Sequence, residues 1–386
     1  FHSWIIPTGN PSGSLSTSTP FPAEGCFALS KKEQPSKQAT CNVQKITGFC
    51  KGIARWITAV GPNPLQMLYN PFSRPGYILN FTCILLYSYT FYTDEHTCMD
   101  PENGERLMKH NRYYKTTPDH KQLFIQQWLP GDDFSSVVLY VHGLGSHSGR
   151  IEEWANRFVQ KNIAFIAWDQ RGHGQSDGRR GTPTRASVLI NDLKNLVEAI
   201  REEFPGKKII LYGHSMGGSI AINYVISTTY TVEALITTSP WLKMTQPPSE
   251  TLMRFTRSLA RLAPGMVISN RLDPDDISRD QQVVDAYKND PLVHDRISLG
   301  LFHSMYETGL NALRNVYKIN CPYLIMHGTA DRITSHRAST NYVMNTSDRT
   351  RLQLWEGAYH ELHHEPEKDQ VFDYIMGWLR EYGFAP

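Results

Sequence analysis

Residues 207–224 read KKIILYGHSMGGSIAINY, and this stretch decides the fold. An apolar run ends at Tyr212, the turn GHSMG follows at residues 213–217, and a helix-like segment begins directly after it. The pattern G-x-S-x-G between a strand and a helix predicts a sharp turn that lifts a serine hydroxyl out of a sheet. We expect its two glycines to be required because backbone and the neighbouring helix crowd the turn, where a β-carbon would clash. Ser215 is therefore the candidate nucleophile.

Strands and helices alternate on both sides of this turn. Short strands are expected at residues 113–116 and 123–128, apolar strands at 137–141, 163–168, 209–212, 234–237 and 323–326, and an amphipathic helix at 187–204. Continuous apolar runs are typical of strands that are buried on both faces of a parallel sheet. The alternation predicts an α/β fold with a mostly parallel, doubly wound sheet, whose ligands bind at the carboxyl ends of the strands.

The alternation stops between residues 241 and 318, which we interpret as a helical cap inserted into the domain. Leu252, Phe255, Leu259 and Leu262 recur there at helical spacing. Such an apolar face is expected to pack on the core, to contact substrate, or to do both.

The first 107 residues differ in composition from the rest, being rich in Ser, Thr, Pro, Gly and Lys with little periodicity. We expect residues 1–107 to be a disordered or dispensable extension, residues 108–386 to form the folded domain, and the native start to lie near Met99 or Met108. The apolar run at residues 77–92 is shorter than the roughly 20 residues that cross a bilayer. An alternative interpretation of residues 67–98 is a signal peptide, although no small-x-small cleavage site follows.

Composition excludes several classes of protein. With 40% hydrophobic and 20% charged residues and a net charge of +2, the chain is typical of a globular protein, and no nucleic-acid partner is expected. Cys321 is the one cysteine among residues 108–386, which excludes a disulfide framework there. We therefore expect a cytoplasmic protein, or a secreted one if residues 67–98 act as a signal peptide. The oligomeric state stays open.

Two downstream residues are the expected partners of the serine. A serine hydroxyl barely ionises near neutral pH, so it needs a base to take its proton and an acid to orient that base. In folds with this turn the chain order is serine, acid, histidine. Asp331 follows the strand at residues 323–326, and His360 follows the strand-like residues 352–355. We expect Asp331 to be the orienting acid and His360 the general base.

Two backbone amides are expected to stabilise the oxyanion of the tetrahedral intermediate. One is the amide of Met216, directly after the nucleophile, and the other is the amide of Leu144, in the loop after the strand at 137–141. Chemistry of this kind needs no cofactor and no metal.

A zinc site competes for the same segment, because HELHH at residues 360–364 fits H-E-x-x-H. That motif must be helical throughout to place both histidines on one face. Pro366 is tolerated only in the first turn of a helix, so we expect the helix to begin near Glu365, after the motif. His363 and His364 are then loop or surface histidines, and no metal is expected. Inactivation by a chelator without labelling by a fluorophosphonate would favour zinc.

From about Met108 to its C-terminus the chain resembles the monoacylglycerol lipase and lysophospholipase branch of the α/β-hydrolases, often described as serine-aminopeptidase-like. The resemblance rests on four blocks in order: HGLGSHSGR (142–150), DQRGHGQSDG (169–178), GHSMGG (213–218) and GAYHEL (357–362). In that family the second block is a turn that buttresses the site, which implies structural roles for Asp169 and Arg171. The chain departs at Ser146, where the family usually has an acidic residue, and at His364, where it often has Asn.

The resemblance implies hydrolysis of a single-chain acyl lipid, such as a monoacylglycerol, through an acyl-enzyme intermediate. It also implies an acyl tunnel formed by residues 241–318. Contact of this apolar cap with lipid surfaces is a further hypothesis. The residues alone add only that the cap has apolar helical spacing and no charged cluster for a phosphate or α-amino group.

Three alternatives stay open. A short-chain esterase or a serine peptidase would use the same three residues. A non-catalytic ligand receptor would need altered catalytic or oxyanion residues. A lyase or dehalogenase of this fold would need a change such as Asp at position 215, which is Ser215 here.

Overall fold

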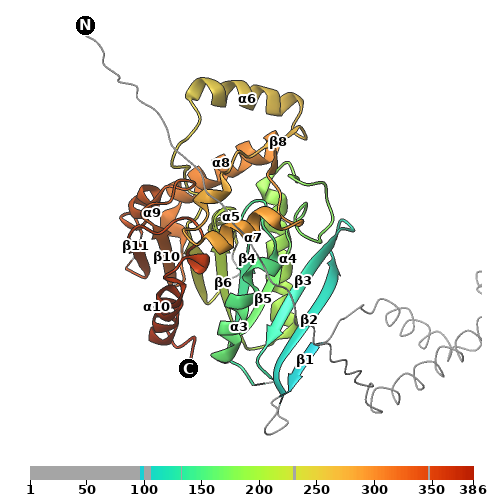
Figure 1. Ribbon diagram of the computed structural model, residues 1–386, viewed down its shortest axis with the longest axis vertical. Coiled ribbons are helices and arrows are strands. Elements are labelled where there is room, and N and C mark those ends of the chain that lie inside the picture. Colours follow the sequence, from blue (N-terminus) through green and yellow to red (C-terminus); the bar gives the residue numbers. More distant parts are fainter. Residues whose placement is uncertain (1–95, 100–105, 132, 229–231, 347) are drawn as a thin grey trace, which may run out of the picture. The chain divides into compact units, whose positions relative to one another are not determined.

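Nine strands form one sheet in the order β1-β2-β3-β5-β4-β6-β7-β10-β11 (Figure 1). The computed structural model describes residues 96–99, 106–131, 133–228, 232–346 and 348–386. The strands are β1 (His96–Met99), β2 (Arg106–Thr116), β3 (Gln122–Leu129), β4 (Ser136–Val141), β5 (Ala164–Trp168), β6 (Lys208–His214), β7 (Ala234–Thr238), β10 (Tyr323–Gly328) and β11 (Thr350–Trp355). In this order, the neighbouring strands from β1 to β5 pair antiparallel. The neighbours from β5 through β4, β6, β7 and β10 to β11 pair parallel. The predicted mostly parallel α/β fold is confirmed.

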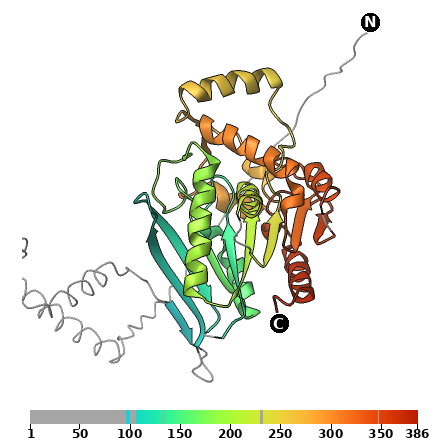
Figure 2. The same ribbon diagram turned by 180° about the vertical axis from the view of Figure 1, so that it is seen from behind.

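Helices cover both faces of the sheet. On one face lie α3 (Glu152–Gln160) and α10 (Lys368–Glu381), and on the other lie α4 (Ala186–Glu203), α5 (Met216–Ser227) and α9 (His336–Val343). Figure 2 shows α4 in green across the second face. Val138 and Tyr140 of β4 belong to the core under α3 and α10, whereas Leu139 and Val141 belong to the core under α4 and α5. Burial on both faces is why β4 is apolar at successive positions.

The cap consists of an inner and an outer part. Its elements are α6 (Glu250–Leu262), β8 (Val267–Ser269), η3 (Pro274–Asp276), α7 (Gln281–Asn289), β9 (Arg296–Ser298), α8 (Leu299–Arg314) and η4 (Val316–Lys318). α8 packs on α5 and buries Leu301, Met305 and Ala312 in the core. α6 lies beyond α8 (Figure 1), and none of its residues is buried. The expectation that the apolar face of residues 252–262 packs on the core is therefore wrong, because α8 already covers that position.

The expected domain boundary at residue 108 falls inside β2. β2 begins at Arg106 and pairs with β1, which precedes it, so the sheet includes part of the expected extension. Residues 1–95 lie outside the described residues, so their expected disorder and the signal-peptide interpretation stay predictions. Of the helices that the structure describes, none is long and apolar enough to span a membrane. Cys321 is buried and its thiol is free.

Candidate active site

The turn between β6 and α5 holds Ser215 in a backbone conformation that serine rarely adopts. Its φ is 54° and its ψ is −117°. A β-carbon on Gly213 would lie 2.6 Å from the carbonyl oxygen of Gly217, and one on Gly217 would lie 2.1 Å from that of Val141. Both distances are shorter than any normal contact, so this turn requires glycine at both positions, as predicted.

Backbone hydrogen bonds from neighbouring strands hold the serine in this conformation. The amide of Ser215 donates to the Thr238 carbonyl at 3.0 Å, and the amide of Trp241 donates to the Ser215 carbonyl at 2.9 Å. A residue in such a region costs on the order of 1–3 kcal/mol and persists only where its surroundings over-determine it. Strain of this kind clusters at functional sites, which supports Ser215 as the reactive residue.

Asp331 and His360 meet at the carboxyl ends of the adjacent strands β10 and β11. His360 Nδ1 lies 2.7 Å from Asp331 Oδ2, and the two residues are only 5% and 3% exposed. The amides of Ile333 and Thr334 donate to Asp331 Oδ1 at 2.8 and 2.9 Å. The carboxylate is therefore fixed on one side by the backbone and presents its other oxygen to the imidazole.

The electrostatics of this pair favour the charge distribution that a general base needs. Burial raises the pKa of Asp331, but the charge of His360 and the hydrogen bonds from His327 and His360 hold it well below its ordinary 3.8. Burial likewise lowers the pKa of His360, but the carboxylates of Asp331 and Glu361 raise it above its ordinary 6.5. An ionised Asp331 therefore stabilises the imidazolium that forms when His360 accepts a proton.

Residues at the end of β7 bring the serine and the histidine to the same edge of the sheet. Thr238 accepts the Ser215 amide, and the next residue, Ser239, donates its hydroxyl to the carbonyl of His360 at 2.7 Å. The ring of His214, directly before Ser215, lies 4.8 Å from the ring of His360. Burial and the His360 charge lower the pKa of His214 to about 3, so it stays neutral beside the base.

The two amides expected to form the oxyanion hole flank the serine. Met216 is the first residue of α5, so its amide lies at the positive end of a helix dipole. Leu144 follows Gly143, and a β-carbon on Gly143 would lie 3.6 Å from Ser215 Oγ. Neither amide donates to another group in the described part of the chain. Both are free to bind an anionic oxygen beside the serine.

The second sequence block holds the loop that carries Leu144. Asp169 accepts the amide of Ser148 at 2.6 Å and the amide of Gln175 at 2.7 Å. Arg171 Nε donates to Asp192 at 2.5 Å. These contacts are structural, as expected for Asp169 and Arg171.

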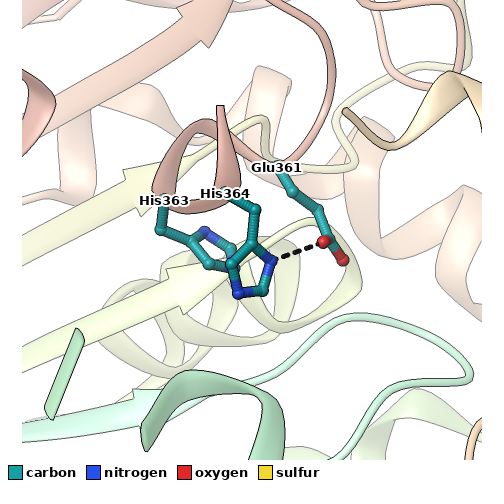
Figure 3. Close-up of side chains that lie close together, drawn as sticks. All are labelled: Glu361, His363 and His364. Atoms are coloured by element: carbon teal, nitrogen blue, oxygen red, sulfur yellow. Dashed lines mark hydrogen bonds and ion pairs between the residues drawn. The ribbon is translucent and has the colours of Figure 1, made fainter. Parts of the chain in front are cut away.

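The competing zinc motif does not have the geometry that it requires. Figure 3 shows Glu361, His363 and His364, the one group in the described residues whose nitrogen and oxygen atoms lie close enough to share an ion, within 4.8 Å. His360, the first residue of the motif, is not a member of this group, and its Nδ1 lies 2.7 Å from Asp331 Oδ2. Residues 362–364 form only a short 3-10 helix, and α10 begins at Lys368, slightly later than predicted.

The carboxylate in that group already has a cation of its own. Arg150 donates to both oxygens of Glu361 at 2.6 and 2.8 Å, and His364 Nδ1 lies 2.7 Å from Oε2. The guanidinium of Arg150 outweighs burial and holds the pKa of Glu361 well below its ordinary value. His363 is only 4% exposed and its ring packs against that of His214. The expectation that His363 lies at the surface is therefore wrong. We conclude that this cluster is an ion-pair network.

Several contacts around the site escaped sequence analysis. The cap contacts the loop that carries Leu144: the amide of His294 donates to the Gly145 carbonyl at 3.0 Å, and Asp290 pairs with His147 at 2.8 Å. The cap also contacts the segment that follows His360, where Arg279 pairs with Glu365. No local pattern marks these residues, because each contact joins segments that are far apart in the chain.

Known proteins resemble this chain over the same region. Residues 132–367 match the family model described as serine aminopeptidase, S33. A monoacylglycerol lipase of Mycolicibacterium smegmatis is 33% identical over 65% of this chain and 90% of its own length. An uncharacterized abhydrolase domain-containing protein of Dictyostelium discoideum is 35% identical over 69% of this chain, which spans only 28% of that protein. The crystal structure of Paleococcus ferrophilus monoacylglycerol lipase is 30% identical, with a TM-score of 0.62 over 68% of this chain and 99% of its own.

Proposed function

The chain belongs to the serine aminopeptidase S33 family of α/β-hydrolases, and from that premise we propose that it hydrolyses single-chain acyl lipids such as monoacylglycerols. It is a serine hydrolase. The observation that best supports the proposed site is the buried contact of 2.7 Å between His360 Nδ1 and Asp331 Oδ2, beside the strained turn of Ser215. Relatives named as monoacylglycerol lipases support the substrate class.

In the proposed reaction His360 Nε2 takes the proton of Ser215 Oγ as that oxygen bonds to the ester carbonyl carbon. The carbonyl electron pair moves to oxygen, where the amides of Leu144 and Met216 stabilise the negative charge. When the tetrahedral intermediate collapses, His360 gives its proton to the departing alcohol oxygen and leaves an acyl-serine. His360 then takes a proton from water as the water oxygen bonds to the acyl carbon. When this second intermediate collapses, the bond from the acyl carbon to Ser215 Oγ breaks, His360 returns the proton to Oγ, and the fatty acid leaves. Asp331 keeps the Nδ1–H tautomer of His360 throughout.

A panel of three substrates tests the proposed substrate class. Purified protein is assayed with a long-chain monoacylglycerol, p-nitrophenyl acetate and an aminoacyl substrate, and kcat/KM is expected to be highest for the monoacylglycerol. Preference for the acetate would support the short-chain esterase, and preference for the aminoacyl compound would support the peptidase. Binding of a lipid without turnover of any ester would support the receptor.

We also propose that the exposed face of α6 binds lipid surfaces. Phe255 is 65% exposed and Leu262 is 85% exposed, and Met266 and Ile268, which follow α6 in the chain, are also exposed. Arg254 and Arg261 of α6 are exposed as well. Apolar side chains beside basic ones are typical of segments that lie in the interface of a membrane.

Substituting Phe255 and Leu262 by glutamate should weaken this binding. Each apolar side chain that leaves the lipid loses on the order of 1.5–3 kcal/mol, so hydrolysis of vesicle-borne monoacylglycerol should fall at least about tenfold. Hydrolysis of p-nitrophenyl acetate should not change. Thr251→Glu adds a charge to the same helix without removing an apolar group and is the matched control. Equal losses in the control, or none in the double variant, would contradict this surface.

The rate should depend on ionisation of His360. Because the base acts only when neutral and its pKa is raised above 6.5, kcat/KM should reach half its maximum above pH 6.5 on the acid side. Below that midpoint it should fall roughly tenfold per pH unit. A pH series with an uncharged soluble ester measures this limb. Full activity at pH 4 would rule out His360 as the base.

The single cysteine among residues 108–386 supports a cytoplasmic location, which we add to the proposal. Cell fractionation tests this location. Recovery of the chain in the medium would support the signal-peptide interpretation of residues 67–98 instead.

A further inference from the structure

The carboxylate of Asp331 contacts two imidazoles. Besides His360, the fully buried His327 of β10 places its Nε2 at 3.0 Å from Asp331 Oδ2 and at 3.1 Å from the carbonyl oxygen of Thr334. Both partners can only accept, so Nε2 of His327 carries a hydrogen and donates it. His327 Nδ1 lies 2.8 Å from the hydroxyl of Ser339, which can donate to it. The ring is therefore held on both sides in one tautomer.

We propose that His327 is a positioning residue for the reaction: its Nε2–H holds the Asp331 carboxylate toward His360 and takes up part of its negative charge. The inference rests on the proposed roles of Asp331 and His360. Oδ1 of Asp331 is held by two backbone amides, and Oδ2 lies 2.7 Å from His360 Nδ1, 3.0 Å from His327 Nε2 and 2.9 Å from the hydroxyl of Thr334. These N–H donors prevent the carboxylate from rotating. They also divide the charge on the oxygen that polarises the base.

This arrangement predicts how loss of His327 changes the base. The charged and titratable groups that face His360 are Asp331 on the β10 side, His214 on β6, Glu361 in its own segment and Asp276 in the cap. His327 acts on the base through Asp331. Without that donor more charge stays on Oδ2, so His360 binds its proton more tightly and the acid limb of kcat/KM moves to higher pH. A role in packing alone would lower the rate without moving the limb.

Two substitutions of the same residue separate these outcomes. His327→Leu removes the donor, so the acid limb should rise by on the order of half to one pH unit. Its kcat should fall roughly ten- to a hundredfold with KM little changed, a loss like that seen when the hydrogen-bond partner of a metal-ligating side chain is removed. His327→Gln keeps an N–H at a similar distance from the backbone and should restore both values toward wild type. His336→Gln removes a histidine whose ring lies 6.4 Å from that of His327, and it is the matched control.

A second measurement needs no substrate. Nitrogen-15 NMR titration of His360 should give a higher midpoint in His327→Leu than in the wild type, and a wild-type midpoint in His327→Gln and His336→Gln. If His327→Leu does not fold, Ser339→Ala releases the other side of the ring and should shift the midpoint in the same direction by less. An unchanged midpoint in the folded variants would overturn the inference. If the wild type hydrolyses no ester, the proposed function fails, and this titration still decides the role of His327.

Discussion

Replacing Ser215 by alanine is expected to lower ester turnover by roughly 10⁴- to 10⁶-fold, because the nucleophile is lost and the remaining groups act as a unit with it. Stability should hardly change. In the described part of the chain Ser215 Oγ makes no hydrogen bond to another residue, so its removal leaves no buried partner unsatisfied. Alanine keeps the β-carbon and hence the same backbone strain at φ 54°. Assays of kcat/KM and of Tm measure the two effects separately.

A serine in the first turn of α5, directly after the nucleophile turn, gives the matched control. Ser219 is fully buried on α5, and its hydroxyl has no hydrogen-bond partner among the residues that the structure describes. Ser219→Ala should therefore turn over ester at a rate close to that of the wild type and should still be labelled by a fluorophosphonate. Ser215→Ala should lose the label. Normal turnover by Ser215→Ala would show that another residue is the nucleophile.

The strands that sequence analysis located most accurately are those buried on both faces. In β4 all six residues are buried, so the apolar run and the strand nearly coincide. β2 was predicted only at residues 113–116, yet it spans Arg106–Thr116. Its polar residues, such as Lys109 and Asn111, pair with β3 through the backbone. Strand pairing of that kind depends on the neighbouring strand, and local hydrophobicity does not reveal it.

The candidate site was predictable where the strands alone determine it. Ser215, Asp331 and His360 each follow a parallel strand, and the carboxyl ends of parallel strands lie at one edge of the sheet. The ion pair between Arg150 and Glu361 was not predictable, because it joins residues 211 positions apart. The apolar period of α6 predicted a helix correctly. The periodicity of the apolar residues predicts which side chains share a face of the helix. It does not predict what that face contacts, which depends on the position of the neighbouring helix α8.

Asp331→Asn is expected to lower kcat by about 10⁴-fold, although it replaces only one oxygen by nitrogen. The amides of Ile333 and Thr334 both donate to the Oδ1 position, so the amide oxygen of asparagine must take that position. Its NH₂ group then occupies the Oδ2 position and faces the Nδ1–H of His360, 2.7 Å away in the wild type. Two donors cannot bond each other, so His360 must move its hydrogen to Nε2. In that tautomer Nε2 has no lone pair with which to take the serine proton.

The same substitution tests whether the three residues act together. If Asp331 works only through His360 and Ser215, then Ser215→Ala combined with Asp331→Asn should be no slower than Ser215→Ala alone. Each kcat is measured with the same soluble ester, and Tm establishes that each variant folds. Losses that multiply in the double variant would mean that Asp331 contributes to turnover by a route independent of the serine. No such route is expected, because the carboxylate affects the reaction only by directing the lone pair of His360 at Ser215.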